Sequence, residues 1–212
     1  MRAPFGVIDM PHHSETLAAL IGSRICHDLI SPIGAVANGL ELLRLSGADE
    51  RPEMALVSDS AAHANARIRL FRLAFGIASD AQMVSAEEIR RILSEIYDGS
   101  RITLDWAPAD SMARRIAQVV LLATLCCEHA LPYGGALCVR IGDDAWHIRA
   151  QGERLRLDPG FWGLLRGEAQ TAEVPPAAVQ FLLLPLQMAS MNRRCSFETG
   201  PDSVEITIGR QS

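Results

Sequence analysis

His27 and Asp28 are the neighbouring pair of side chains best suited to chemistry, within the segment His27-Asp28-x-x-Ser31-Pro32. A neutral imidazole nitrogen is a good nucleophile toward phosphorus near neutral pH. An adjacent carboxylate can hold the other ring nitrogen and favour the imidazolium-like ring that develops during attack. Ser31 follows one helical turn later, within reach of a phosphoryl group, and Arg24, three residues earlier, can help balance phosphate charge. A lone histidine on a helix can equally be an ordinary surface residue, so the surrounding elements must decide.

The segment lies in a long helical pattern over residues 14–45, for which Ser14 is the predicted N-cap. Apolar residues recur there at spacings of three and four: Leu17, Ile21, Ile25, Leu29, Ile33, Val36, Leu40 and Leu43. At about 100° per residue, His27 faces away from this stripe, among small or polar residues that let another surface approach. Pro32 removes one backbone hydrogen bond and predicts a kink.

A second helix is predicted from Pro52 to about Ala78, after a turn marked by Gly47 and Asp49. The two helices form an antiparallel hairpin, which buries too little surface alone. We therefore expect two copies to pair into a dimeric four-helix bundle.

From residue 85 the pattern is that of an α/β sandwich. We expect helices near residues 85–98, 111–131 and 174–191, a strand at 101–106, and strand hairpins at 136–150 and 194–208. The predicted fold class is α+β, organised as a flexible lead (1–13), the helical hairpin (14–80) and the sandwich (81–212).

Composition excludes several classes of function. The net charge of -5 and the absence of a basic stripe argue against nucleic-acid binding. All 20 basic residues are arginine, which excludes a Walker A loop and Schiff-base lysine chemistry. No second histidine follows His27 at the spacing of a metal site. The five cysteines show no C-x-x-C spacing, and neither a signal peptide nor a membrane span is evident, so a cytoplasmic protein is expected.

The segment from His27 to Pro32 resembles the H-box of sensor histidine kinases, H-[ED]-x-x-[TNS]-P. More closely, Ile25 to Ala35 followed by Asn38-Gly39-Leu40-Glu41 resembles the ChpT-type histidine phosphotransferases of alphaproteobacteria. The second helix resembles the same family over residues 69–76, and the resemblance extends over nearly the whole chain.

The resemblance implies a homodimer that is shaped like a histidine kinase and lacks kinase activity. Such a protein relays phosphoryl groups in two-component, cell-cycle signalling, from the receiver domain of a hybrid histidine kinase to response regulators. His27 would then carry the phosphoryl group, Asp28 would orient or deprotonate its ring, and Ser31 and Arg24 would support them. The magnesium ion would belong to the receiver, so no cofactor of the chain's own is expected.

The second half resembles a kinase ATP-binding domain but departs from it where nucleotide chemistry occurs. His129 stands where the N-box has its magnesium-binding asparagine, and Pro132 stands where it has lysine. Ala150 replaces the aspartate of the D-x-G-x-G box, and bulky residues at 179–186 replace the glycines that let backbone approach phosphate. We expect no ATP binding.

Three arginines on the second helix, Arg67, Arg69 and Arg72, form either a solvated face or a docking surface for an acidic receiver domain. Leu20 and Phe75 are candidate apolar contacts for the same docking. Two rival functions remain open: an active histidine kinase with atypical nucleotide binding, and a non-catalytic dimeric scaffold in which His27 is incidental.

Overall fold

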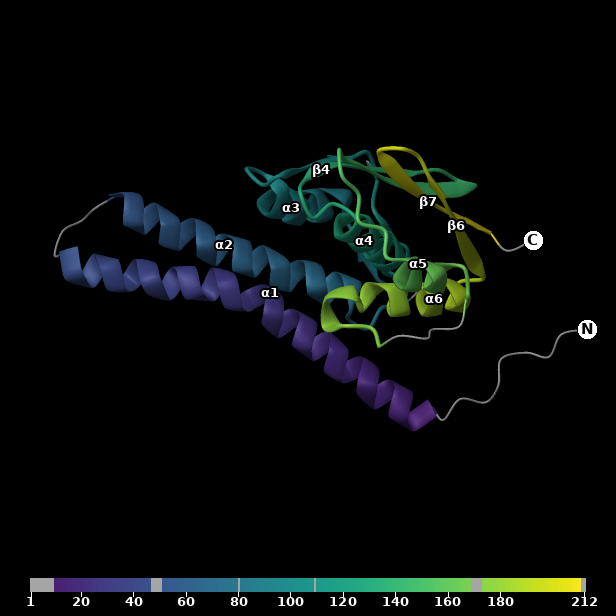
Figure 1. The fold of residues 1–212 in the computed structure, drawn as a ribbon, viewed down its shortest axis with the longest axis horizontal. Helices are drawn as coiled ribbons and strands as arrows, with labels where there is room; N and C mark the ends of the chain where they lie inside the picture. The colour runs from purple at the N-terminus through teal and green to yellow at the C-terminus, as the bar shows by residue number, and fades with distance from the viewer. Residues whose placement is uncertain (1–9, 47–50, 80, 109, 169–172, 211–212) are drawn as a thin grey trace, which may run out of the picture.

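The computed structural model describes residues 10–46, 51–79, 81–108, 110–168 and 173–210, which form a long helical hairpin and a mixed helix-and-sheet domain (Figure 1). Helices α1 (Met10–Ser46) and α2 (Arg51–Ala74) lie antiparallel, and the sheet domain packs beside the end of α2. The predicted fold class, a helical N-terminal part followed by an α+β domain, is confirmed. The predicted turn residues Gly47 and Asp49, and residues 1–9 of the expected lead, lie outside the described residues.

Helix α1 begins earlier than predicted. It starts at Met10, so Ser14 lies inside the helix and the predicted N-cap there is wrong. Pro32 lies within α1 without ending it, and the helix changes direction part-way along its length (Figure 1). A bend is expected of a helix that contains proline, because one backbone hydrogen bond is lost.

Helix α2 ends at Ala74, four residues before the predicted end. Its last carbonyl groups are bonded by side chains of the sheet domain: Arg114 Nη2 donates to Arg72 O at 2.7 Å, and Gln118 Nε2 donates to Ala74 O at 3.1 Å. Gly76 permits this close turn, since a Cβ atom there would lie 2.4 Å from Arg72 O. The helix stops early because these contacts satisfy the carbonyl groups that a further turn would use.

The sheet has five strands in the order β2-β4-β5-β7-β6. They are β2 (Ile102–Trp106), β4 (Gly135–Ile141), β5 (Ala145–Gln151), β6 (Arg193–Thr199) and β7 (Ser203–Arg210). Strands β2 and β4 pair in parallel and the other neighbours pair antiparallel. All five match predicted strands to within about two residues at each end, the usual precision of such boundaries.

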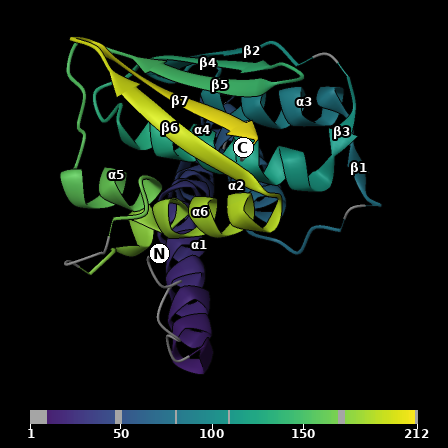
Figure 2. The same ribbon diagram turned by 90° about the vertical axis from the view of Figure 1, so that its right-hand side faces the viewer.

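The helices of the domain cover one face of this sheet (Figure 2). They are α3 (Ala86–Tyr97), α4 (Arg114–His129), α5 (Pro159–Leu165) and α6 (Gln180–Ser190), with a 3-10 turn η1 (Pro176–Ala178) before α6. The single helix predicted over residues 174–191 is therefore wrong, because η1 and α6 are separate elements. Helix α5 and the short paired strands β1 (Met83–Val84) and β3 (Met112–Ala113) were not predicted.

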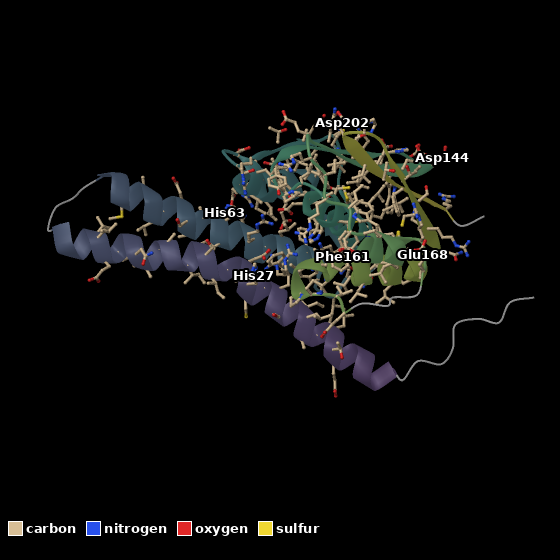
Figure 3. All side chains as sticks on the ribbon, in the orientation of Figure 1. His27, His63, Asp144, Phe161, Glu168 and Asp202 are labelled. Carbon is tan, nitrogen blue, oxygen red and sulfur yellow. The ribbon has the colours of Figure 1, made fainter. Side chains whose placement is uncertain are left out.

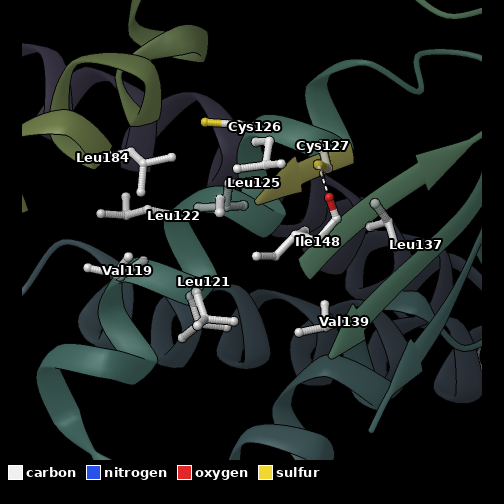
Figure 4. Close-up of a cluster of buried hydrophobic side chains, with 14 of the residues drawn as sticks. Val119, Leu121, Leu122, Leu125, Cys126, Cys127, Leu137, Val139, Ile148 and Leu184 are labelled. Atoms are coloured by element: carbon white, nitrogen blue, oxygen red, sulfur yellow. Dashed lines mark hydrogen bonds between the residues drawn. The ribbon is translucent and has the colours of Figure 1, made fainter. Parts of the chain in front are cut away.

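Helix α4 is the centre of the hydrophobic core. Its side chains from Ala117 to Cys127 are buried between the sheet and the neighbouring helices (Figure 4). Leu70 and Leu73 of α2 are buried in the same cluster, so the end of the hairpin and the sheet domain share one core. The outer face of the sheet is polar, with His147 Nδ1 2.9 Å from Glu205 Oε1.

Candidate functional site

His27 is presented on α1, in the stretch of the hairpin next to the sheet domain (Figure 3). Its side chain is 76% exposed, and its Nδ1 lies 3.2 Å from Asp28 Oδ1. An ionised carboxylate only accepts hydrogen bonds, so this contact requires the proton on Nδ1. The Nε2 atom is then the ring nitrogen with a free lone pair. The arrangement is that of an accessible nitrogen nucleophile oriented by a carboxylate.

Arg24 does not lie on the exposed face where the helical pattern put it. The residue is only 9% exposed, and its Nε donates to Asp28 Oδ2 at 2.9 Å. Its Nη1 donates to Ala177 O and, at 3.4 Å, to Gln180 Oε1. The guanidinium group of Arg24 is therefore turned toward the sheet domain, and its part in balancing phosphate charge stays a prediction.

A groove of about 1150 Å³ runs between the hairpin and the sheet domain beside His27. Ser31, which is exposed, and Pro32, which is half-buried, line it next to the histidine. The rest of the lining is mostly polar: Arg24, Asp28 and Ala35 of α1, Asp59, Ser60, Ala62, His63 and Arg67 of α2, and Glu95, Asp98, Arg101 and Glu128 of the sheet domain. The groove therefore offers hydrogen-bonding groups from three sides to whatever approaches His27.

Three further residues predicted to support the site or to dock a partner, Leu20, Asn38 and Phe75, are not among those that line this groove. Asn38 is exposed on α1, about 16 Å farther along the helix at 1.5 Å per residue. Leu20 and Phe75 are half-buried against the core, and the Phe75 ring stacks on Phe71 with centroids 5.2 Å apart. Their part in docking stays a prediction.

The three arginines of α2 do not form one free cluster. Arg67 donates to Glu128 Oε1 at 3.0 Å, and Arg69 donates to Glu95. Arg72 is exposed. Two members of the predicted docking surface therefore join the hairpin to the sheet domain, and Arg72 alone keeps the exposure that the prediction needs.

Glu128 is a functional-site residue that sequence reasoning missed. Tyr97 Oη donates to its Oε2 at 3.0 Å while Arg67 occupies Oε1. Burial and the charge of Glu128 raise the pKa of Tyr97, so the phenol stays protonated as a donor. Burial alone would lower the pKa of Arg67, but the charge and hydrogen bond of Glu128 outweigh it and raise that pKa. No local pattern signals this network, because its members come from three helices.

His63 and Gln180 were also missed. His63 lies on α2 and lines the same groove as His27 (Figure 3). Burial lowers its pKa, as does the charge of Arg67, so the neutral ring is favoured. Gln180 is 1% exposed and begins the apolar helix α6. A single amide before an apolar run is the one sequence signal that points to it.

Aromatic side chains pack around His129 in the sheet domain. The His129 ring packs on Phe161 and Phe181 with centroids 5.8 Å and 5.6 Å apart, and Trp162 packs on Phe181 at 5.5 Å. Ala150 and Val179 are fully buried. Burial lowers the pKa of His129, and the charges of Arg24 and Arg156 lower it further. His129 and Pro132 also line a cavity of about 330 Å³, together with Arg101 and Arg156.

The described part of the chain contains neither a candidate metal-binding cluster nor a helix that could span a membrane. No three or more histidine, cysteine, aspartate or glutamate side chains gather there in a way that could hold a metal ion. Within the same residues, no helix combines the length and apolar character needed to cross a membrane.

Comparison with known proteins gives three consistent matches. Residues 86–203 match the model of the histidine phosphotransferase C-terminal domain family. The protein phosphotransferase ChpT of Brucella abortus (strain 2308) is 37% identical over 183 residues, which cover 82% of this chain and 87% of that protein. A solved structure described as a bacterial phosphotransferase is 30% identical and superposes with a TM-score of 0.78, covering 98% of this chain and 100% of that one.

Proposed function

Because this chain belongs to the histidine phosphotransferase family, we propose that His27 accepts a phosphoryl group from an aspartyl phosphate on one receiver domain and passes it to an aspartate on another. The observation that carries the proposal is the geometry of His27. Its side chain is 76% exposed on a continuous helix, with Nδ1 3.2 Å from the Asp28 carboxylate. The nucleophile is thus both accessible and oriented.

The transfer is a displacement at phosphorus. The Nε2 lone pair of His27 attacks, an N–P bond forms, and the bond from phosphorus to the receiver's carboxylate oxygen breaks with its electron pair returning to that oxygen. The ring becomes positively charged, since Nδ1 keeps its proton, and the Asp28 carboxylate stabilises this charge. Attack by the carboxylate of a second receiver reverses the step and restores neutral His27.

The partner in each step supplies what this chain does not. The receiver would bring its own Mg²⁺ ion, which would offset charge on the transferred group, and we expect the chain to need no cofactor of its own. Ser31 lies one turn from His27 at the edge of the groove, where its hydroxyl can donate to a phosphoryl oxygen. The upstream partner is the receiver of a hybrid histidine kinase and the downstream partners are response regulators, in a cytoplasmic two-component pathway linked to the cell cycle. Neither nucleic acid nor a membrane is among the proposed partners.

ATP is not a substrate in this proposal. Histidine, proline and alanine stand at positions 129, 132 and 150, where the kinase motifs have asparagine, lysine and aspartate. The rings of Phe161 and Phe181 also pack on His129, so that side chain is held among aromatic residues. The sheet domain serves instead to position α1 and to form one wall of the groove.

A homodimer is also part of the proposal, with a second copy of the hairpin as the occupant of its apolar face. Ile30, Ile33 and Leu40 of α1 are 70%, 56% and 51% exposed and fall within an arc of about 80° at 100° per residue. Met54 and Ile68 of α2 are 55% and 48% exposed. Exposed apolar side chains on two antiparallel helices are buried when two hairpins form a four-helix bundle.

A transfer assay tests the function. A phosphorylated receiver domain of a hybrid kinase from the same organism is mixed with the wild-type protein, with His27→Gln, and with His147→Gln as a matched control on the outer face of the sheet. We expect acid-labile, base-stable label on the wild type and on His147→Gln, and none on His27→Gln.

Two outcomes would contradict the proposal. Label on His27 from ATP and Mg²⁺ without any receiver would identify an autokinase. Absence of label on the wild type, with a receiver that labels another phosphotransferase, would favour a non-catalytic scaffold.

A further inference from the structure

A chain of contacts joins the interior of the sheet domain to His27. Gln180 Oε1 accepts from Arg24 Nη1 at 3.4 Å, Arg24 Nε donates to Asp28 Oδ2 at 2.9 Å, and Asp28 Oδ1 lies 3.2 Å from the histidine Nδ1. Exposure rises along the chain, from 1% for Gln180 and 9% for Arg24 to 76% for the side chain of His27. The Gln180 end of this series of contacts is therefore rigid, and the His27 end is accessible.

The buried amide of Gln180 has a defined orientation. Its Nε2 donates to Ala177 O at 3.2 Å and to Leu125 O at 3.5 Å, both of which are carbonyl oxygens that can only accept. The Oε1 atom must then face the other way, toward Arg24. The amide is thus held as an acceptor for the guanidinium group by two backbone groups of the sheet domain.

Arg24 is held at Nε, at Nη1 and over an aromatic ring. In addition to Gln180 and Asp28, it donates to Ala177 O, and its guanidinium carbon lies 5.9 Å from the centre of the Phe71 ring. A buried arginine with several fixed partners has little freedom to rotate, which distinguishes it from a surface ion pair. Its donation to Oδ2 fixes the plane of the Asp28 carboxylate and so the position of Oδ1.

We propose that Gln180 and Arg24 are positioning residues for phosphotransfer, through which the sheet domain holds the Asp28 carboxylate and thereby keeps the proton of His27 on Nδ1. The inference rests on the proposed function of His27. It gives the sheet domain a direct part in the reaction, because the tautomer with a proton on Nδ1 is the one that leaves Nε2 free to attack phosphorus.

Two substitutions of Gln180 test the inference. Gln180→Leu keeps the size of the side chain and removes the acceptor, whereas Gln180→Glu keeps an acceptor for Arg24. The readouts are the single-turnover rate of transfer from a phosphorylated receiver, the affinity for that receiver, and the His27 tautomer by ¹⁵N NMR. We expect Gln180→Leu to slow transfer about tenfold with unchanged affinity and a mixed tautomer, because misorientation of a reacting group is costly. Gln180→Glu should keep more of the wild-type rate than Gln180→Leu, because it retains the acceptor for Arg24 while losing the amide donor to Ala177 O and Leu125 O.

A matched control is another buried glutamine between the same two parts of the molecule. Gln118 is 3% exposed and bonds the end of α2. Gln118→Leu should lower stability without changing the His27 tautomer. If Gln180→Leu does not fold, Arg24→Lys tests the same link, since one ammonium group cannot hold both Asp28 and Gln180 as the guanidinium group does.

The outcomes distinguish a failure of the positioning role from a failure of the proposed phosphotransfer function. Transfer by Gln180→Leu at the wild-type rate, with the wild-type tautomer, would overturn the positioning role and leave the phosphotransferase intact. A tautomer shift of equal size in Gln118→Leu would also overturn it, since general loosening would then explain the effect. Absence of phosphohistidine on the wild type would instead remove the proposed function.

Discussion

Arg67 on α2 and Glu128 on α4 form an ion pair of 3.0 Å across the junction of the hairpin and the sheet domain. Their side chains are 16% and 17% exposed, and Tyr97 donates to the second oxygen of the carboxylate. The ion pair therefore links α2, which lines part of the groove, to α4 at the centre of the core. Removing one partner leaves the other charge shielded from water, which is costly.

Glu128→Gln should lower the free energy of unfolding by about 3 kcal/mol, because Arg67 then stays buried without a counter-charge. Urea denaturation measures the change. Glu198→Gln, at an exposed position on β6, is the control and should change stability by less than about 0.5 kcal/mol. Equal effects of the two substitutions would show that the ion pair adds nothing to the junction.

Stability should fall as the solution becomes acidic, and His129 should contribute to the fall. Burial lowers the pKa of His129 below its ordinary 6.5, so the unfolded chain takes up the proton before the folded protein does. Its stabilising contribution is complete above pH 6.5 and is lost as the pH falls from there through the lower folded pKa. Urea unfolding of the wild type and of His129→Phe between about pH 7.5 and 5.5 should give a flatter dependence for the variant. If the free energy of unfolding changed with pH equally in the two proteins, His129 would be excluded as a source of the pH dependence.

Asp28→Asn should slow phosphotransfer to His27 about 100-fold, the order of magnitude of a lost acid-base partner. A neutral amide cannot stabilise the positive ring, and it can present its NH₂ group to Nδ1 and so favour the other tautomer. Asp144→Asn is the control, since that residue lies on the opposite side of the molecule from His27 (Figure 3). Rapid-quench measurement of phosphohistidine gives both rates. An unaltered rate in Asp28→Asn would remove the carboxylate from the mechanism.

Leu40→Glu should convert the proposed dimer to a monomer, because a charge in the centre of a bundle interface cannot be solvated there. Sedimentation equilibrium measures the mass. Ile77→Glu is the matched control: Ile77 is 95% exposed but lies beyond the end of α2, so its mass should stay that of a dimer. A wild-type protein that sediments as a monomer at micromolar concentration would contradict the dimer.

The position and exposure of His27 could be predicted from the sequence because both depend on local periodicity. The five strands could be predicted as well, because apolar and polar residues alternate along them and turn residues bound them. The end of α2 could not be predicted, since Arg114 and Gln118 reach its carbonyl groups from about 40 residues away. Helix α5 carries a local signal that was overlooked: Asp158 caps Gly160 N at 2.9 Å and proline follows at the first helical position.

Within the site, the position of Arg24 was misjudged for a related reason. Helical periodicity places a residue on a face of its own helix, but it does not say what packs against that face. Here η1 and α6 cover it, and the guanidinium group finds Ala177 O and Gln180 there. Long-range partners of this kind follow from the tertiary fold alone.

The position of α4 between two packed layers limits which substitutions the family can tolerate. Its side chains contact the sheet on one side and the hairpin on the other, so a change of volume in α4 disturbs both layers together. The outer face of the sheet meets solvent, and His147 and Glu205 pair with each other there. Substitutions should accumulate on that outer face over many generations, and a lineage could remodel it for new purposes while the geometry around His27 is inherited unchanged.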